Sequence, residues 1–201
     1  MRTIRLFILV LLAPAAALAE PVDELADALT PLQQMQGTFT QRQYDETGNL
    51  LLESSGEFRL LRPDYFAWDI RSPDSQLVVA GPDFVWHHDR DLETVTRRPI
   101  ASIGDLAPLQ VLGGDIDTLR TAFTVTRTET GNFLLSPVNA QASFIELEVA
   151  LEAGVVTQMR VLDTLEQTLD VSFGGIETDT TLTAADFAFT PPPDADLFYH
   201  D

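Results

Sequence analysis

The sequence predicts a mainly β fold, in which a strongly curved, incompletely closed antiparallel sheet carries short helices over its concave face. Three observations lead to this prediction. Turn signals recur through most of the chain at intervals of roughly 8–12 residues, which is typical of antiparallel meanders. Apolar and polar residues alternate between many of those turns. Only two regions depart from the strand pattern, and a sheet that buries one face needs them as its cover.

Residues 1–19 have the features of a secretory signal peptide. Two arginines precede a short apolar stretch, and residues 17–19 (Ala-Leu-Ala) form a small-x-small cleavage site. No later segment approaches the roughly 18 apolar residues that a membrane-spanning helix requires. We therefore expect cleavage before Glu20 and release of residues 20–201 as a single soluble domain.

The first structural element that we expect is an N-terminal helix. Its apolar residues recur at steps of three and four: Val22, Leu25, Leu29, Leu32 and Met35. Thr30 can cap a helix, and Pro31 suits the first helical position. We therefore predict a helix near residues 22–29, a kink or restart at Thr30-Pro31, and an end at Gly37.

Strands separated by turns account for most of the chain after Gly37. The expected turns lie at residues 47–49, 62–64, 72–74, 81–83, 89–91, 130–132 and 153–154. Alternation is clearest late in the chain, where we expect Ile145 and Leu147 on the buried face and Phe144 and Glu146 on the opposite face. Residues 168–173 alternate in the same way.

Residues 100–122 lack this alternation. Proline and glycine divide them into two pieces, which we expect to be short helices around 105–112 and 115–122. Together with the N-terminal helix they are the available cover for the concave face. A tight cover would make that face an ordinary core and a loose one would make it a lidded apolar cavity, and the pattern alone fits both. The three prolines at 191–193 lead into what we expect to be a loose acidic tail.

Composition narrows the classes of function. The chain has 31 acidic and 12 basic residues, a net charge of −19, and no lysine. Such a surface repels nucleic acid and anionic lipid headgroups. The acidity fits either genome composition and a salty habitat or a surface that keeps the protein off membranes. Cysteine is absent, so the fold holds without disulfides, and position 20 lacks the cysteine that a lipid-anchored protein needs for acylation.

The stretch 37–68 carries the most specific pattern. It contains a Phe-Thr-Gln strand, a Gly-Asn turn, a second apolar strand, Arg62-Pro63, and the aromatic residues Phe66 and Trp68. Further pieces follow in order at 73–79, 81–86, 108–114 and 185–192. Together they resemble the periplasmic outer-membrane lipoprotein carrier family (LolA), over nearly the whole mature chain.

That resemblance implies both a fold and a function. It implies an unclosed β-barrel with a helical lid over a hydrophobic cavity for the acyl chains of lipoproteins, with no cofactor. It implies a periplasmic carrier that takes cargo from an inner-membrane ABC transporter and passes it to an acylated outer-membrane receptor. We expect this carrier to be a monomer. The alternative is a sensor or accessory module that binds lipid or lipoprotein on the same scaffold without carrying it.

The same resemblance assigns candidate site residues. Phe39, Phe66 and Trp68 match family aromatics in or near the cavity, and Met35 is expected to face it; the alternative is that they only fill a core. We expect Arg62 to be a latch, because the family's Arg-Pro guanidinium bonds to lid carbonyls; the alternative is a solvated arginine. Trp86 and Phe58 are expected to be core residues.

The sequence gives little support for a metal site or for catalysis. His87, His88, Asp89 and Asp91 are metal-ligand types, but adjacent strand residues point to opposite faces, so the two imidazoles should diverge. The third histidine, His200, lies in the tail. No Gly-x-Ser-x-Gly nucleophile turn is present, and acidic pairs arise by chance in so acidic a chain. We therefore expect no metal site and no enzymatic activity.

Overall fold

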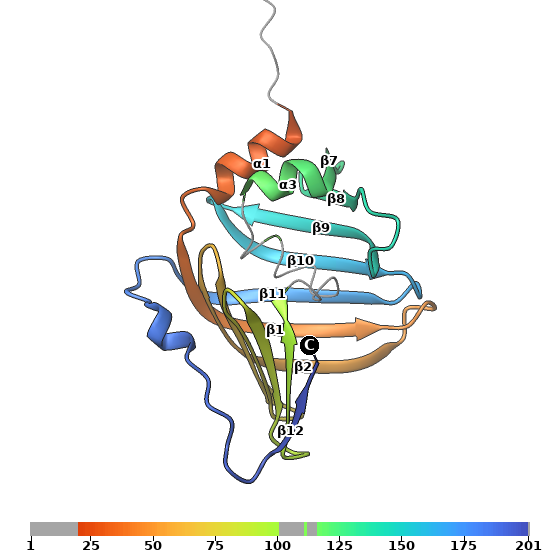
Figure 1. Cartoon of the computed structure of the whole chain (residues 1–201). Coiled ribbons are helices and arrows are strands. Elements are labelled where there is room, and N and C mark those ends of the chain that lie inside the picture. The colour runs from red at the N-terminus through yellow and green to blue at the C-terminus, as the bar shows by residue number, and fades with distance from the viewer. Residues whose placement is uncertain (1–19, 101–110, 112–115, 201) are drawn as a thin grey trace, which may run out of the picture.

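A single sheet of 12 strands dominates the computed structural model, which describes residues 20–100, 111 and 116–200 (Figure 1). The strands are β1 Gln34–Tyr44, β2 Leu50–Leu61, β3 Tyr65–Ser72, β4 Gln76–Ala80, β5 Phe84–Asp89, β6 Thr94–Pro99, β7 Phe123–Arg127, β8 Phe133–Pro137, β9 Phe144–Glu152, β10 Val155–Asp163, β11 Thr168–Glu177 and β12 Asp196–Tyr199. The helices are α1 Pro21–Leu29, α3 Ile116–Ala122 and the 3-10 helix η2 Ala184–Phe187. The expected signal peptide, and the expected helix at 105–112 apart from Val111, lie outside the described residues.

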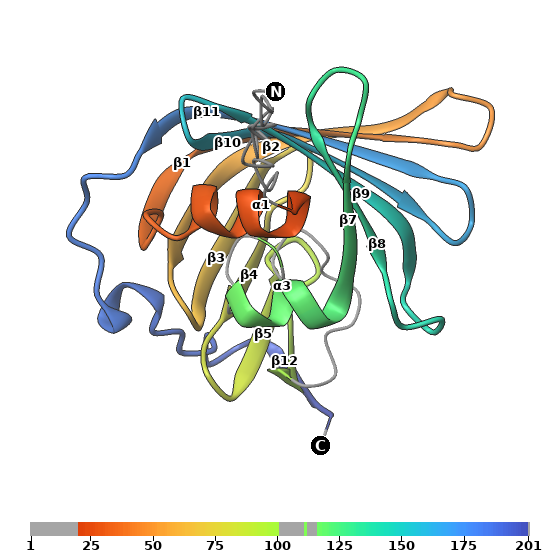
Figure 2. The ribbon, with the colours of Figure 1, turned by 90° about the horizontal axis from the view of Figure 1, so that it is seen from above.

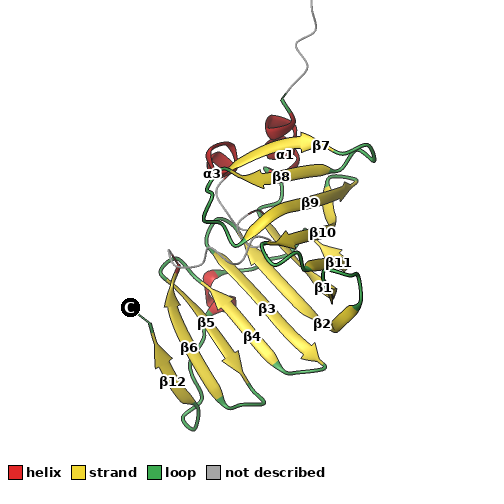
Figure 3. Ribbon diagram, turned by 90° about the vertical axis from the view of Figure 1, so that its right-hand side faces the viewer, coloured by secondary structure: helices red, strands yellow, loops and turns green. Residues whose placement is uncertain are grey.

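The sheet is strongly curved and does not close. Its strand order is β12-β6-β5-β4-β3-β2-β1-β11-β10-β9-β8-β7, so β12 and β7 are its two edges (Figure 3). Neighbouring strands are antiparallel except β12 and β6, which pair in parallel, with Leu197 opposite Val95. This confirms the predicted mainly β fold with short helices. The expectation of a loose C-terminal tail was wrong, because the chain returns after the three prolines to extend the sheet.

The predicted turns all lie between consecutive strands. Three of them place a glycine in the left-handed region, at Gly48 (φ 83°), Gly131 (φ 86°) and Gly154 (φ 79°), which a side chain would make costly. In the first hairpin the Asp45 carboxylate also accepts hydrogen bonds from the backbone N–H groups of Thr47 and Asn49. Local turn chemistry therefore sets where strands begin and end.

Helix α1 begins with Pro21, whose fixed φ suits the first turn, and carries acidic residues near its N-terminus. It buries Leu25 and Leu29 completely. The predicted helical restart after residue 30 was wrong, because β1 already begins at Gln34, which pairs with Leu61. Met35 is therefore a strand residue. The apolar spacing of three that suggested a helix there comes from two different elements that both face the core.

Most of the hydrophobic core lies on the concave face of the sheet, beneath α1 and α3 (Figure 2). On β9 the predicted alternation is wrong at its start: Ile145 is 44% exposed and Phe144 is buried. The pairing of β9 with β10 is irregular at this point, where Leu162 faces Glu146 but Asp163 faces Phe144. This bulge shifts Phe144 to the inner side, whereas Leu147 follows the prediction.

The convex face is also partly covered, by the C-terminal segment. Phe187 of η2 packs with Ala67 and Val79 in a second, smaller buried cluster. Trp86 contacts Phe189 (ring centroids 5.5 Å apart) and is half-buried on this outer face, so the expectation that it is a core residue was wrong. Strand alternation cannot reveal which face is inner when apolar residues cover both.

Candidate functional site: the concave aromatic cluster

Five aromatic side chains from four strands meet on the concave face. They are Phe39 from β1, Phe58 from β2, Phe66 and Trp68 from β3, and Phe173 from β11. We call this group the concave aromatic cluster. Such pairs contribute about 0.5–1.5 kcal/mol beyond burial. The cluster thus forms a continuous apolar floor across neighbouring strands.

Trp68 lies at the centre of this cluster. Its ring centroid is 3.6 Å from that of Phe39 in a stacked arrangement and 5.7 Å from that of Phe66. Phe39 and Trp68 lie on strands separated by β2, and the residue of β2 opposite Phe39 is Gly56. The two rings therefore meet across the intervening strand.

The structure brings together the four residues predicted to line a cavity. Met35, Phe39 and Phe66 are buried and Trp68 is half-buried, and all four belong to the cluster that contains Leu25 and Leu29 of α1. The sequence reasoning placed Phe58 only in the core and did not name Phe173 as a site residue. The alternation of residues 168–173 already put Phe173 on the buried face and could have identified it. Whether these residues line a ligand cavity stays a prediction.

The cover over the cluster comes from α1 and α3 (Figure 2). Arg120 of α3 pairs with Asp23 of α1 at 2.9 Å, and Arg127 of β7 pairs with Glu24 of α1 at 2.7 Å. Both pairs are solvent-exposed, so each contributes at most about 1 kcal/mol. Among the described residues, these ion pairs add only weakly to the apolar contacts that hold the helices in place.

Arg62, at the turn after β2, lies beside this cover. Its guanidinium Nη2 donates a hydrogen bond to the backbone carbonyl of Val111 at 3.2 Å, and its backbone N–H donates to the carbonyl of Gln33 at 2.8 Å. Burial lowers the pKa of Arg62 from its ordinary value, yet an arginine stays charged. Val111 is fully buried in the main core. Arg62 therefore links the rim of the sheet to Val111.

The concave face becomes polar at the start of β4 and the end of β5. Gln76 of β4 donates to the Asp89 carboxylate at 3.2 Å and lies 3.2 Å from Nε2 of His87. Burial lowers the pKa of His87, and Arg98 acts in the same direction while Asp89 opposes it. His88 faces the other way, against the Phe189 ring. The predicted divergence of the two imidazoles is confirmed, and no cluster of three metal-ligand side chains occurs within residues 20–100, 111 and 116–200.

A curved, unclosed sheet that carries an aromatic cluster on its concave face beneath short helices defines the fold class of this protein. Comparison with known proteins makes the class specific. Residues 30–190 match the family described as "Outer membrane lipoprotein carrier protein LolA". The chain belongs to this family. Membership confirms the resemblance drawn from the sequence and identifies a carrier family rather than an enzyme family.

Individual relatives agree. The outer-membrane lipoprotein carrier protein of Alkalilimnicola ehrlichii is 35% identical over 192 residues, covering 96% of this chain and 88% of the relative. That of Pseudomonas aeruginosa PAO1 is 31% identical over 205 residues, covering 98% and 99%. A crystal structure of a LolA superfamily protein from Nitrosomonas europaea has a TM-score of 0.55 at 8% identity, over 85% of this chain and 99% of that one. The structural likeness establishes the fold alone. Among the described residues, no helix has the length and apolar character needed to cross a membrane.

Proposed function

We propose that this chain is a periplasmic carrier of lipoproteins destined for the outer membrane, and that the concave aromatic cluster binds their acyl chains. The observation that carries the proposal is the meeting of Phe39, Phe66 and Trp68 on one curved face beneath helices. Full-length membership of the lipoprotein carrier family supports the cargo class. Residues 1–19 would direct export and then be cleaved, which leaves residues 20–201 as the mature domain.

The energetics of acyl chains explain why such a carrier is needed. Each methylene group exposed to water costs about 0.8 kcal/mol, so a lipoprotein removed from a membrane needs a dry shelter. A shelter closed by strong contacts would admit no cargo. The surface ion pairs between α1 and its neighbours are weak, which favours a cover that can open.

We propose that Arg62 acts as the latch of this cover. The hydrogen bond from its guanidinium to the Val111 carbonyl forms only when the segment before α3 lies against the sheet. A hydrogen bond from a charged donor contributes about 1.5–3 kcal/mol, enough to shift a balanced two-state equilibrium about tenfold or more. The latch would favour the closed, empty state and so promote release of cargo.

The partners follow from the resemblance. We propose that an inner-membrane ABC transporter loads the carrier and that an acylated outer-membrane receptor accepts the cargo. The carrier itself needs neither cofactor nor energy source, because transfer depends only on relative affinities. A sensor on the same scaffold would bind acylated ligand but would not pass it on.

A transfer assay tests the proposal. The purified mature protein is incubated with a triacylated lipopeptide, and native mass spectrometry records the loaded fraction before and after addition of acceptor vesicles. We expect a 1:1 complex that loses its ligand to the acceptor. Absence of binding would overturn the carrier proposal, and binding without transfer would favour the sensor. A stable dimer in the same spectra would refute the expected monomer.

A further inference from the structure

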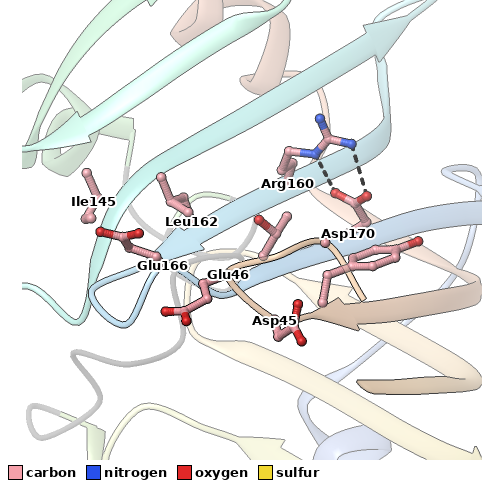
Figure 4. Close-up of a pocket in the computed structure, with 10 residues that line it drawn as sticks. Asp45, Glu46, Ile145, Arg160, Leu162, Glu166 and Asp170 are labelled. Atoms are coloured by element: carbon pink, nitrogen blue, oxygen red, sulfur yellow. Dashed lines mark hydrogen bonds and ion pairs between the residues drawn. The ribbon is translucent and has the colours of Figure 1, made fainter. Parts of the chain in front are cut away.

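Two hairpin turns on the convex face enclose a depression that the lipoprotein-binding proposal does not use. The β1–β2 turn and the β10–β11 turn end side by side, and the depression between them has a volume of about 670 Å³ (Figures 1 and 4). The register of β1 with β11 places Tyr44 opposite Thr168 at its base. Asp170 alternates with the inward-facing Val171, so the depression lies on the face opposite the aromatic cluster.

Apolar side chains are exposed in and beside this depression. Ile145, turned outward by the bulge in β9, is 44% exposed, and it lines the depression together with Leu162 and Tyr44. Leu165, at the tip of the β10–β11 turn, is 71% exposed. Exposed apolar side chains that gather in a depression with a polar rim mark an interaction surface more often than isolated apolar side chains do.

The rim is strongly acidic. Among the described residues that line the depression, Arg160 is the one basic residue, and its guanidinium is already bound to Asp170 at 2.6 and 3.0 Å (Figure 4). Among the residues that the structure describes, neither Glu46 nor Glu166 is in an ion pair. Hydrogen bonds from Asn49 and Thr47 lower the pKa of Asp45 to about 2, so this carboxylate is also ionised at neutral pH. Three carboxylates therefore remain without a cationic partner near the apolar side chains of Ile145 and Leu162.

We propose that this depression docks a segment of a partner protein in which arginine or lysine side chains surround one aliphatic or aromatic side chain. The apolar side chain would pack on Ile145 and Leu162, and the cations would face Glu46 and Glu166. Charge complementarity selects this occupant, because the same carboxylates repel anionic lipid headgroups and nucleic acid. Since the surface lies on the convex face, a partner could bind there whether or not the concave face holds cargo.

A peptide titration tests this inference. The probe is a fluorescein-labelled pentapeptide of two arginines, leucine and two arginines, and its twin carries serine in place of leucine. Binding to the mature protein is followed by anisotropy at 0.15 M and 0.5 M NaCl. The test variants are Glu46→Gln/Glu166→Gln and Ile145→Ser. The matched control, Glu129→Gln/Asp179→Asn, removes the same charge from exposed positions outside the depression.

We expect the Kd of the apolar probe to rise about fivefold or more in both test variants and less than about twofold in the control, and to rise with salt. The serine twin should bind wild type about fivefold more weakly. An equal loss in the control variant would show diffuse attraction to an acidic protein, and the inference would fail. It would also fail if wild type did not bind the probe at 0.15 M NaCl. Lipopeptide binding by the test variants should be unchanged, which separates this result from the carrier proposal.

Discussion

Arg62 and Val111, which lie 49 positions apart in the chain, are joined by a hydrogen bond from the arginine Nη2 to the valine carbonyl oxygen. The bond connects the turn after β2 to Val111, which is buried in the main core. It gives the proposed latch one donor and one acceptor that can be tested. The acceptor is a backbone group, so the test must remove the donor.

Arg62→Leu should increase the fraction of carrier isolated with lipoprotein. Without the charged donor the closed state loses about 1.5–3 kcal/mol, so cargo competes better with closure. The measurement is the loaded fraction by native mass spectrometry after expression in a bacterium, with the melting temperature alongside. Arg71→Leu, which removes an arginine from an exposed pair with Glu57, is the control. An unchanged loaded fraction with normal transfer, or an equal rise in the control, would refute the latch.

Phe66→Ala should separate ligand binding from packing when it is compared with Phe187→Ala. Both phenylalanines are buried, but Phe66 lies in the main cluster and Phe187 in the convex-face cluster. Each substitution should lower the free energy of unfolding by about 3–5 kcal/mol. Only Phe66→Ala should also weaken lipopeptide binding per folded molecule. Equal affinity in the two variants would assign Phe66 to the core alone.

Much of this fold could be predicted from turn residues and alternation, because both are local. The β1–β2 turn and the span of α1 are examples, since Gly48 tolerates the left-handed conformation of the turn and apolar residues recur on one face of the helix. The errors arose where distant pairing decides the outcome. Ile145 turns outward because β9 is irregular against β10, and Gln34 begins a strand because Leu61 lies opposite it.

The candidate site was predicted only in part for a similar reason. Single positions such as Phe39 and Trp68 could be matched to family aromatics, but their stacking depends on how β1, β2 and β3 pair in the sheet. The resemblance predicted a backbone carbonyl as the partner of Arg62, but not that it belongs to Val111, since backbone acceptors leave no mark in a sequence. The acidic depression on the convex face was not predicted, because its carboxylates come from two turns that lie far apart in the chain.

Gly56→Ala should destabilise the protein severely, whereas Gly81→Ala should be tolerated. A Cβ at Gly56 would lie 1.9 Å from the carbonyl oxygen of Asp69, and a Cβ at Gly81 would have no atom within 4 Å. Relief requires the backbones of β2 and β3 to separate, at a cost of about 3 kcal/mol or more. Urea denaturation of both variants measures the difference. Equal midpoints would contradict the close approach of the two strands.

The Asp45 carboxylate should titrate far below an ordinary aspartate. Its pKa is lowered from 3.8 to about 2 by hydrogen bonds from Asn49 and Thr47. Because the folded pKa is the lower one, the stabilising contribution is present above pH 3.8 and is lost as the pH falls toward 2. The carboxyl ¹³C chemical shift should show a midpoint near pH 2. The stability difference between wild type and Asp45→Ala should shrink over the same range, and a midpoint near 3.8 would contradict the turn geometry.

The most direct test of acyl binding on the concave face uses the two tryptophans, which lie on opposite faces of the sheet. Trp68 is in the concave aromatic cluster and Trp86 packs against Phe189 on the convex face. A lipopeptide with brominated acyl chains quenches only nearby tryptophans. It should quench the fluorescence of Trp86→Phe, which retains Trp68, and leave Trp68→Phe nearly unchanged, after lipopeptide binding by both variants has been established. Quenching in Trp68→Phe alone would place the acyl chains on the convex face and contradict the account.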